Sequence, residues 1–402
     1  MFFIKSAFCR VFQIVFHIAL PILPYREPEI VNSCNDIGSI LRKKNINSVL
    51  IVTDKGIVNN GIVLPIEKSL QESNIKYSIY DKTNPNPTVD NVEEALLVYK
   101  ANNCNGLIAV GGGSPMDCAK AVGAIVVYPK KSVGNMKGIF RVLRKIPTLI
   151  AIPTTAGTGS EVTLASIISD SEKQHKYAIM SFSLIPHYAV LDASLTYSLP
   201  QHLTATTGMD ALTHAVEAYI GRSTTKETRR LALLAVKQIF SNIEKAYIDG
   251  KNHNARNSML QASYYAGIAF SKSYVGYIHA IAHSLGGQYG IPHGLANAVI
   301  MPYMLEAYGK SVYKKLYMLG INAGVCDKSD SYEVGAHKFI EAIKNMNNDM
   351  GIPQKIEGIK KEDISLMAKH AEKEANPLYP VPKLMTKKEL EKIYYKIANL
   401  NK

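Results

Sequence analysis

The apolar pattern of the chain changes near residue 198, and this change limits the fold more than any other feature. Between about residues 46 and 195, short β-rich runs alternate with helix-like stretches, which predicts a parallel sheet covered by helices. After residue 199 the pattern is helical, with few strand signals. The β-rich runs are 48–53, 76–80, 106–110 and 148–152, and the later helical stretches are 204–220, 226–247, 255–270, 277–286 and 387–400. We therefore expect an α/β domain over residues 1–198 and an all-helical domain over residues 199–402.

Length, charge and cysteine usage exclude several classes of protein. A chain of 402 residues is too long for one compact core, so two domains are the default. The net charge is +13, but the basic residues are scattered and no nucleic-acid motif occurs, so we expect no nucleic-acid partner. The five cysteines are widely spaced and form no CxxC pair, which indicates reduced thiols and a cytoplasmic protein.

The first 24 residues are strongly apolar, with Lys5 and Arg10 near their start. No small-residue cleavage site of a signal peptide follows them. The uncharged run between Arg10 and Tyr25 is too short to span a bilayer. We expect an amphipathic or buried helix, and attachment to a membrane surface is the alternative.

Two loops that follow β-rich runs suit a phosphate or a ribose. In the first, Gly111, Gly112 and Gly113 precede Ser114, a good N-cap, and Pro115, which fits the first position of a helix. Free amides at such a helix start bind phosphate, although a purely structural turn is the alternative. The second loop is PTTAGTGSE at 153–161. Neither loop is a standard phosphate-binding motif.

Asp54 ends the first β-rich run, where a carboxylate can bind a ribose diol and repel a 2′-phosphate. That position favours NAD over NADP, and an N-cap or surface aspartate is the alternative interpretation.

Histidines and a carboxylate recur at helical spacing in the second half. Asp210 and His214 are four positions apart, as are His279 and His283, and His293 follows closely. Residues i and i+4 share one face of a helix, so two helices can present these five groups to a single divalent metal ion. A packed or surface histidine is the alternative for each one, and spacing does not decide which of the five bind the metal.

Four motifs resemble those of the iron-containing, group III alcohol dehydrogenases. They are GGGSPMDCAK (111–120), PTTAGTGSE (153–161), GMDALTHAVEAY (208–219) and HAIAHSLGGQYGIPHGLANA (279–298). The segments VLIVTDKG (49–56) and NPNPT (84–88) add to the match. The resemblance implies a Rossmann-like dinucleotide-binding domain followed by a helical metal-binding domain, the dehydroquinate synthase-like architecture.

The resemblance also implies roles for individual residues. The metal ligands would be Asp210, His214, His279 and His293, and His283 would lie near the nicotinamide and the substrate as a proton relay. The residues that would contact the dinucleotide are Asp54, Asn86, Gly112, Gly113, Ser114, Thr154, Thr155, Thr158, Thr163 and Lys176.

The chemistry implied by the resemblance is hydride transfer between a small primary alcohol, or its aldehyde, and NAD, with Fe²⁺ as the metal. The ligand set alone would also accept Zn²⁺. Ser284 stands where the family usually has proline, and we expect Phe270, Tyr274 and Tyr277 to narrow the substrate pocket.

Two alternatives remain. A glycerol dehydrogenase-like enzyme, or a dehydroquinate synthase-like lyase that also combines NAD with a metal, would share the fold, and a membrane-surface binding protein could keep the fold without activity. The resemblance further implies a homo-oligomer, with a dimer as the simplest form.

Overall fold

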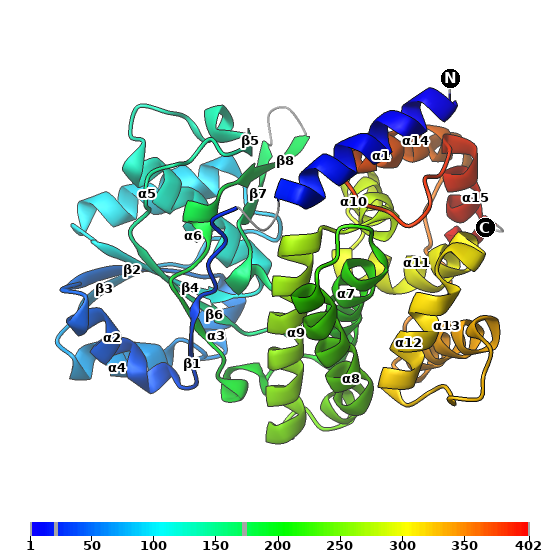
Figure 1. Ribbon diagram of the computed structural model, residues 1–402. Coiled ribbons are helices and arrows are strands. Elements are labelled where there is room, and N and C mark those ends of the chain that lie inside the picture. Colours follow the sequence, from blue (N-terminus) through cyan, green and yellow to red (C-terminus); the bar gives the residue numbers. More distant parts are fainter. Residues whose placement is uncertain (1, 20–22, 171–174, 401–402) are drawn as a thin grey trace. The chain divides into compact units, whose positions relative to one another are not determined.

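The computed structural model describes residues 2–19, 23–170 and 175–400, and the chain divides into two compact units (Figure 1). One unit runs from Pro24 to Leu199, and the other combines residues 1–23 with residues 200–402. The expected assignment of residues 1–24 to the α/β domain therefore differs from the structure. Hydrogen bonds explain the difference, because Arg10 and Gln13 bond to carbonyls between residues 377 and 382 of the helical unit. Residues 1 and 20–22 of the N-terminal segment lie outside the described part.

The α/β unit is built on a six-stranded sheet in the order β1-β9-β6-β4-β2-β3, and its described strand pairings are all parallel. The parallel sheet predicted from the alternating pattern is confirmed. Its strands are β1 (Glu29–Val31), β2 (Ser48–Val52), β3 (Lys76–Tyr80), β4 (Gly106–Gly111), β6 (Thr148–Pro153) and β9 (Tyr188–Val190).

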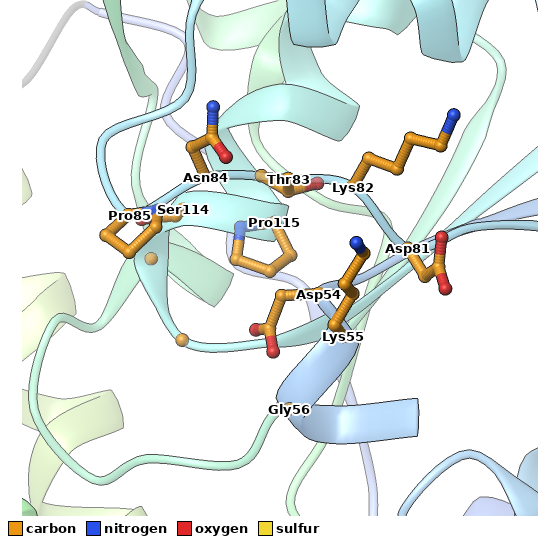
Figure 2. A pocket seen from close by; sticks show the side chains of 12 residues that line it. Asp54, Lys55, Gly56, Asp81, Lys82, Thr83, Asn84, Pro85, Ser114 and Pro115 are labelled. Carbon is orange, nitrogen blue, oxygen red and sulfur yellow. The ribbon is translucent and has the colours of Figure 1, made fainter. Parts of the chain in front are cut away.

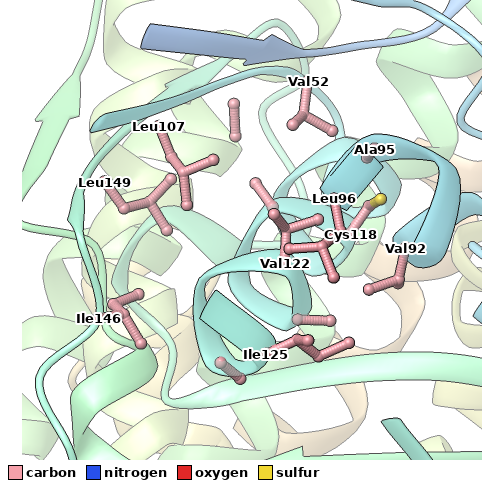
Figure 3. Close-up of a cluster of buried hydrophobic side chains, with 14 of the residues drawn as sticks. Val52, Val92, Ala95, Leu96, Leu107, Cys118, Val122, Ile125, Ile146 and Leu149 are labelled. Carbon is pink, nitrogen blue, oxygen red and sulfur yellow. The ribbon is translucent and has the colours of Figure 1, made fainter. Parts of the chain in front are cut away.

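Helices cover both faces of this sheet, which explains why its central strands are apolar throughout. Leu50 and Val52 of β2 pack on one face against α5 and α6, in the core shown in Figure 3. Val49 and Ile51 point to the other face and pack with residues of α2 and α4. The helices of this unit are α2 (Ile37–Lys43), α3 (Lys55–Asn59), α4 (Leu64–Glu72), α5 (Val89–Ala101) and α6 (Gly113–Val127).

The strand order reverses between β2 and β4. The chain places β3 on one side of β2 and then returns to place β4 on its other side. Ligands of such sheets bind beyond the carboxyl ends of the strands at this reversal. The loops after β2, β3 and β4 are therefore the expected binding loops.

A second, three-stranded sheet was not predicted from the sequence. It comprises β5 (Gly138–Ile139), β8 (His175–Met180) and β7 (Ala165–Asp170), and β7 pairs with β8 in antiparallel register. Residues 171–174, between β7 and β8, lie outside the described part of the chain.

The second unit is helical, as predicted, and the part of residues 200–400 that the structure describes holds no strand beyond an isolated bridge between Ile356 and Ala398. Its central helix α7 packs against α8, α9 and α11, and α10 packs against α11 and α14. The helices are α1 (Phe2–Ala19), α7 (Gln201–Ile220), α8 (Lys226–Ile248), α9 (His253–Ser273), α10 (Tyr277–Tyr289), α11 (His293–Tyr308), α12 (Tyr313–Ala323), α13 (Tyr332–Asp349), α14 (Ile364–Ala375) and α15 (Lys387–Ile397).

Candidate functional site

A pocket of about 590 Å³ lies at the strand reversal of the α/β unit. Figure 2 shows that its lining comes from three segments, 54–56, 81–85 and 112–115, which follow β2, β3 and β4. This volume is within the range of small-molecule and cofactor sites. The pocket includes four residues of the predicted dinucleotide set, namely Asp54, Gly112, Gly113 and Ser114.

The turn from β4 into α6 depends on glycine. Gly111 has φ +141°, and a Cβ there would lie 2.8 Å from the side chain of Pro115. The N-cap of α6 is Gly112, which has extended backbone and no side-chain cap. The expectation that Ser114 caps this helix is wrong, because α6 begins at Gly113. The first amides of α6 lie at the pocket, as phosphate binding requires.

The hydroxyl of Ser114 bonds instead to another predicted cofactor residue. The backbone N–H of Asn86 donates to Ser114 Oγ at 3.2 Å, and Lys176 Nζ donates to Asn86 Oδ1 at 2.9 Å. Burial lowers the pKa of Lys176. Three side chains that are far apart in sequence are thus linked beside the glycine turn, with one cationic group among them.

Three of the predicted threonines after β6 lie together beside the glycine turn of β4. A Cβ on Gly112 would lie 3.5 Å from Thr155 Oγ1, and a Cβ on Gly113 would lie 3.3 Å from Thr158 Cγ2. Thr154 is buried, and its backbone N–H donates to the Gly111 carbonyl at 3.0 Å. Thr154, Thr155 and Thr158 therefore lie against the glycine turn of β4.

Thr163 lies apart from that group. It is buried, and its hydroxyl accepts a 2.9 Å hydrogen bond from the ammonium of Lys120. The same ammonium donates to the backbone oxygens of Ser160 and Ala165 at 2.7 and 2.9 Å. Lys120 thus holds the segment that follows the threonine loop, and although it ends the motif at 111–120, no role for it was predicted from the sequence.

Two carboxylates accompany Lys120, the partly exposed Asp117 and the buried Glu161. Asp117 accepts hydrogen bonds from Ser160 Oγ and from the backbone N–H of Ile167. Desolvation raises the pKa of Asp117 to about 6 and that of Glu161 to about 7, although the nearby Lys120 charge lowers both. Burial also lowers the pKa of Lys120 to about 8. Hydrogen bonds from Lys120 and to Asp117 therefore hold the segment after the threonine loop.

Asp54 is an N-cap, as the alternative interpretation expects. Its Oδ1 accepts from the N–H of Ile57 at 3.0 Å and so caps α3, while the residue also lines the pocket. Binding of a ribose hydroxyl by this carboxylate stays a prediction.

In the helical unit, four predicted residues converge on one point. One ligand atom of each of Asp210, His214, His279 and His293 lies within 4.8 Å of the others. Asp210 Oδ1 is 3.5 Å from His293 Nε2 and 4.0 Å from His279 Nε2. Asp210 and His214 project from α7, His279 projects from α10, and His293 begins α11.

This group has the chemistry of a metal site. Ligands held about 2.0–2.2 Å from one ion lie roughly 3–4 Å from one another, close to the separations found here. His279 Nε2 is buried, and no hydrogen-bond partner approaches it among the residues that the structure describes. Burial, together with the neighbouring His214 and His293, holds the pKa of His279 well below its usual value. Neutral imidazole is the form that binds metal.

Glu217 orients His279 and was not predicted as a site residue. Its Oε2 lies 2.7 Å from His279 Nδ1 and accepts the backbone N–H of Gly276 at 2.7 Å, while Oε1 accepts the N–H of Ile278 at 2.8 Å. The carboxylate therefore caps α10 and turns His279 Nε2 toward Asp210. Burial raises the pKa of Glu217 to about 7, although these hydrogen bonds lower it. Glu217 lies one helical turn after His214 and two turns after Asp210, and this spacing is the sequence signal that could have identified it.

His283 lies beside the cluster and outside it. Its ring stacks on that of His293, with centroids 5.1 Å apart, and its side chain is 44% exposed. Its Nδ1 lies 2.6 Å from Glu374 Oε1, which also accepts the hydroxyl of Tyr379 at 2.8 Å. Burial opposes ionisation of Glu374, but the charge of His283 and its hydrogen bonds lower the pKa of the carboxyl. No local sequence pattern connects residues 283 and 374.

Two residues of α11 support the metal ligands. Asn297, one turn after His293, donates through Nδ2 to Asp210 Oδ1 at 2.6 Å and lies 3.1 Å from His293 Nε2. A Cβ on Gly294 would lie 2.5 Å from the backbone oxygen of Thr206. Glycine at this position therefore lets the start of α11 lie directly against α7.

The aromatic residues expected near the substrate do not all lie at the metal centre. Phe270 stacks on His214, with ring centroids 4.1 Å apart, and so lies at the metal centre. Tyr277 is fully buried, and its hydroxyl donates to Asn376 Oδ1 at 3.2 Å. Its expected role in narrowing the pocket is wrong, because it packs in the core. Ser284 bonds to the Ile281 carbonyl and to Tyr394, which places it away from the ligands.

Both units match known proteins. Residues 30–193 match the iron-containing alcohol dehydrogenase model, and residues 204–398 match the C-terminal model of the Fe-containing alcohol dehydrogenase family. Alcohol dehydrogenase 4 of Saccharomyces cerevisiae is 38% identical over 340 residues, covering 84% of this chain and 87% of that protein. The NAD-dependent methanol dehydrogenase of Bacillus methanolicus is 34% identical, covering 84% of this chain and 88% of that protein. The crystal structure of 1,3-propanediol oxidoreductase aligns with a TM-score of 0.89 at 34% identity, covering 93% of this chain and 99% of that one.

Proposed function

The chain belongs to the iron-containing alcohol dehydrogenase family, and on that premise we propose that it transfers a hydride between a small primary alcohol, or its aldehyde, and NAD. It is an NAD-dependent oxidoreductase. The observation that carries the residue assignment is the convergence of Asp210, His214, His279 and His293, with the half-exposed His283 beside them.

In this proposal the four converging residues hold the metal. Asp210, His214 and His279 are buried, whereas the side chain of His293 is 39% exposed, so the substrate would approach from the side of His293. Glu217 and Asn297 fix the orientation of two of these ligands. When bound, the metal supplies Lewis acidity to an alcohol or carbonyl oxygen and the nicotinamide supplies or accepts the hydride.

His283 moves the proton that accompanies the hydride. Nδ1 bonds to Glu374, and Nε2 takes the hydroxyl proton of the alcohol and returns it when the aldehyde is reduced. Glu374 stabilises the resulting imidazolium, and the Tyr379 hydroxyl holds that carboxylate in place. Phe270, stacked on His214, excludes water from one side of the centre.

The dinucleotide would occupy the pocket at the strand reversal. The first amides of α6 and the hydroxyls of Ser114, Thr155 and Thr158 suit its phosphates, and Lys176 adds a positive charge. Asp54 suits a ribose diol and disfavours a 2′-phosphate, which supports NAD over NADP. The activity named for the similar methanol dehydrogenase supports the same choice.

The test is NADH oxidation with a series of short aldehydes, on protein loaded with Fe²⁺ or Zn²⁺ without oxygen. We expect metal-dependent turnover that His279→Ala abolishes, while His370→Ala, at an exposed histidine of the same unit, leaves it unchanged. Alcohol and NAD should yield a net gain of NADH, which separates a dehydrogenase from a lyase that regenerates its cofactor. No turnover with either metal, in folded protein that binds NADH, would contradict the proposal.

A further inference from the structure

Helix α1 presents its polar side to the protein and its apolar side to solvent. Arg10 Nη1 donates to the Val381 carbonyl at 2.7 Å, and Gln13 Nε2 donates to the Tyr379 carbonyl at 2.7 Å. Cys9 and Gln13 are buried. The helix is therefore fixed to its unit by a narrow polar ridge.

Most of the described surface of the helix is apolar and exposed, with Ser6 and His17 partly exposed. Phe8, Val11, Val15 and Ile18 are 61%, 60%, 62% and 66% exposed. Among the side chains that the structure describes, the exposed apolar residues are Ala7, Phe8, Val11, Phe12, Ile14, Val15 and Ile18, and we call them the α1 face. Soluble helices bury such a stripe, so this orientation requires an external partner.

The α1 face has no place in the dehydrogenase activity. The matched family models begin at residue 30, so α1 lies outside them. Among the described residues, no helix is long and apolar enough to cross a membrane. An amphipathic helix of this length can instead lie in the plane of a bilayer surface.

The unit that carries the α1 face has a positive net charge. The first acidic residue of the chain is Glu27, whereas Lys5, Arg10 and Arg26 precede it. The helical unit holds 28 lysines and arginines against 18 aspartates and glutamates, a net charge of +10 out of the +13 of the whole chain. A basic unit that exposes an apolar helix is complementary to anionic lipid headgroups.

We propose that the α1 face docks the enzyme on the surface of an anionic phospholipid bilayer. The apolar side chains enter the boundary between headgroups and acyl chains, and the positive charge of the unit attracts the anionic headgroups. The seven described exposed residues of the α1 face fall short by themselves of the roughly 20–30 residues per partner of a stable protein interface, whereas they suffice for an amphipathic helix at a bilayer surface. This inference does not depend on the substrate or the metal.

Flotation of the full chain with vesicles tests the proposal. The vesicles are phosphatidylcholine alone, or phosphatidylcholine with 30% phosphatidylserine. The variant Val11→Gln/Val15→Gln/Ile18→Gln removes the apolar face and leaves Arg10 and Gln13 in place. The matched control is Leu97→Gln/Leu143→Gln/Ile248→Gln, at positions that are 68%, 75% and 76% exposed in other elements. Circular dichroism of each protein reports folding.

We expect the wild type and the control to bind the phosphatidylserine vesicles. Raising the salt concentration should weaken this binding at least tenfold. The α1 variant should lose at least tenfold in binding while remaining folded. No flotation of the wild type, equal binding to both vesicle types, or equal binding by the α1 variant would overturn the proposal. A fall in molar mass by light scattering in the α1 variant, without vesicle binding by the wild type, would assign the face to a second copy instead.

Discussion

In the α/β unit the pocket is lined by chain segments that follow strands, whereas in the helical unit the metal candidates project from within helices. Backbone amides and a glycine turn form part of the first site, and its lining adds one serine and one threonine hydroxyl and several charged side chains. The second site depends on four side chains, each with its own supporting hydrogen bond or ring contact. The difference implies that single side-chain changes should be tolerated in the pocket and damaging at the metal centre.

The largest effect is expected at Glu217. Replacing it with glutamine leaves a hydrogen-bonding group beside His279 but removes the charge that fixes the tautomer, so metal affinity should fall about 10–100-fold. Titration of the apo protein with Zn²⁺ measures this. Glu244→Gln, at an exposed position on α8, is the control. Unchanged affinity would mean that the ligands need no supporting carboxylate.

The next effect concerns proton transfer at Glu374. A hydrogen bond to a charged group contributes about 1.5–3 kcal/mol and a neutral one about 0.5–1.5 kcal/mol, so Glu374→Gln should lower kcat about tenfold. Metal content and KM for NADH should stay unchanged, as they should in the exposed control Glu362→Gln. Loss of the metal in Glu374→Gln would instead make this carboxylate part of the metal centre.

A pH effect is expected from the buried Glu161. Because burial raises its folded pKa from 4.5 to about 7, the folded state binds the proton more tightly, and stability falls as the pH rises from about 4.5 to about 7. This rise already includes the opposing charge of Lys120, and it corresponds to a loss on the order of 3 kcal/mol. Calorimetric melting of Glu161→Gln and wild type should therefore diverge above pH 5, with the variant the more stable at pH 8. Parallel curves would show that folding does not raise the pKa of Glu161.

The smallest effect is expected in the pocket. Ser114→Ala removes one hydroxyl that accepts from Asn86 but leaves the amides of α6, so the Kd for NADH should rise only about two- to fivefold. Ser39→Ala, at an exposed serine of the same unit, should leave the Kd unchanged. A rise of more than a hundredfold in Ser114→Ala would mean that side chains, and not the backbone, hold the dinucleotide.

The sequence predicted those features whose signals are local. Strands buried on both faces are continuous apolar runs, so β2, β4 and β6 were identifiable, and residues four apart on one helix pointed to the metal centre. The supporting groups were not predictable, because Glu374 reaches His283 from 91 positions away. The prediction that Ser114 caps α6 was wrong, because the helix begins one residue earlier, after a glycine that has no side-chain cap. The inward polar side of α1 depends on carbonyls near residue 380, which no N-terminal pattern reveals.

The carboxylate of Glu217 caps the start of α10 with both oxygens and orients His279 with one of them, Oε2. The rotational entropy of that imidazole is therefore lost when α7 and α10 pack, before any ion arrives. The ion then meets a rigid ligand, so exchange of one divalent cation for another requires no refolding of the helices. A substitution at residue 217 would therefore alter both the capping of α10 and the orientation of His279.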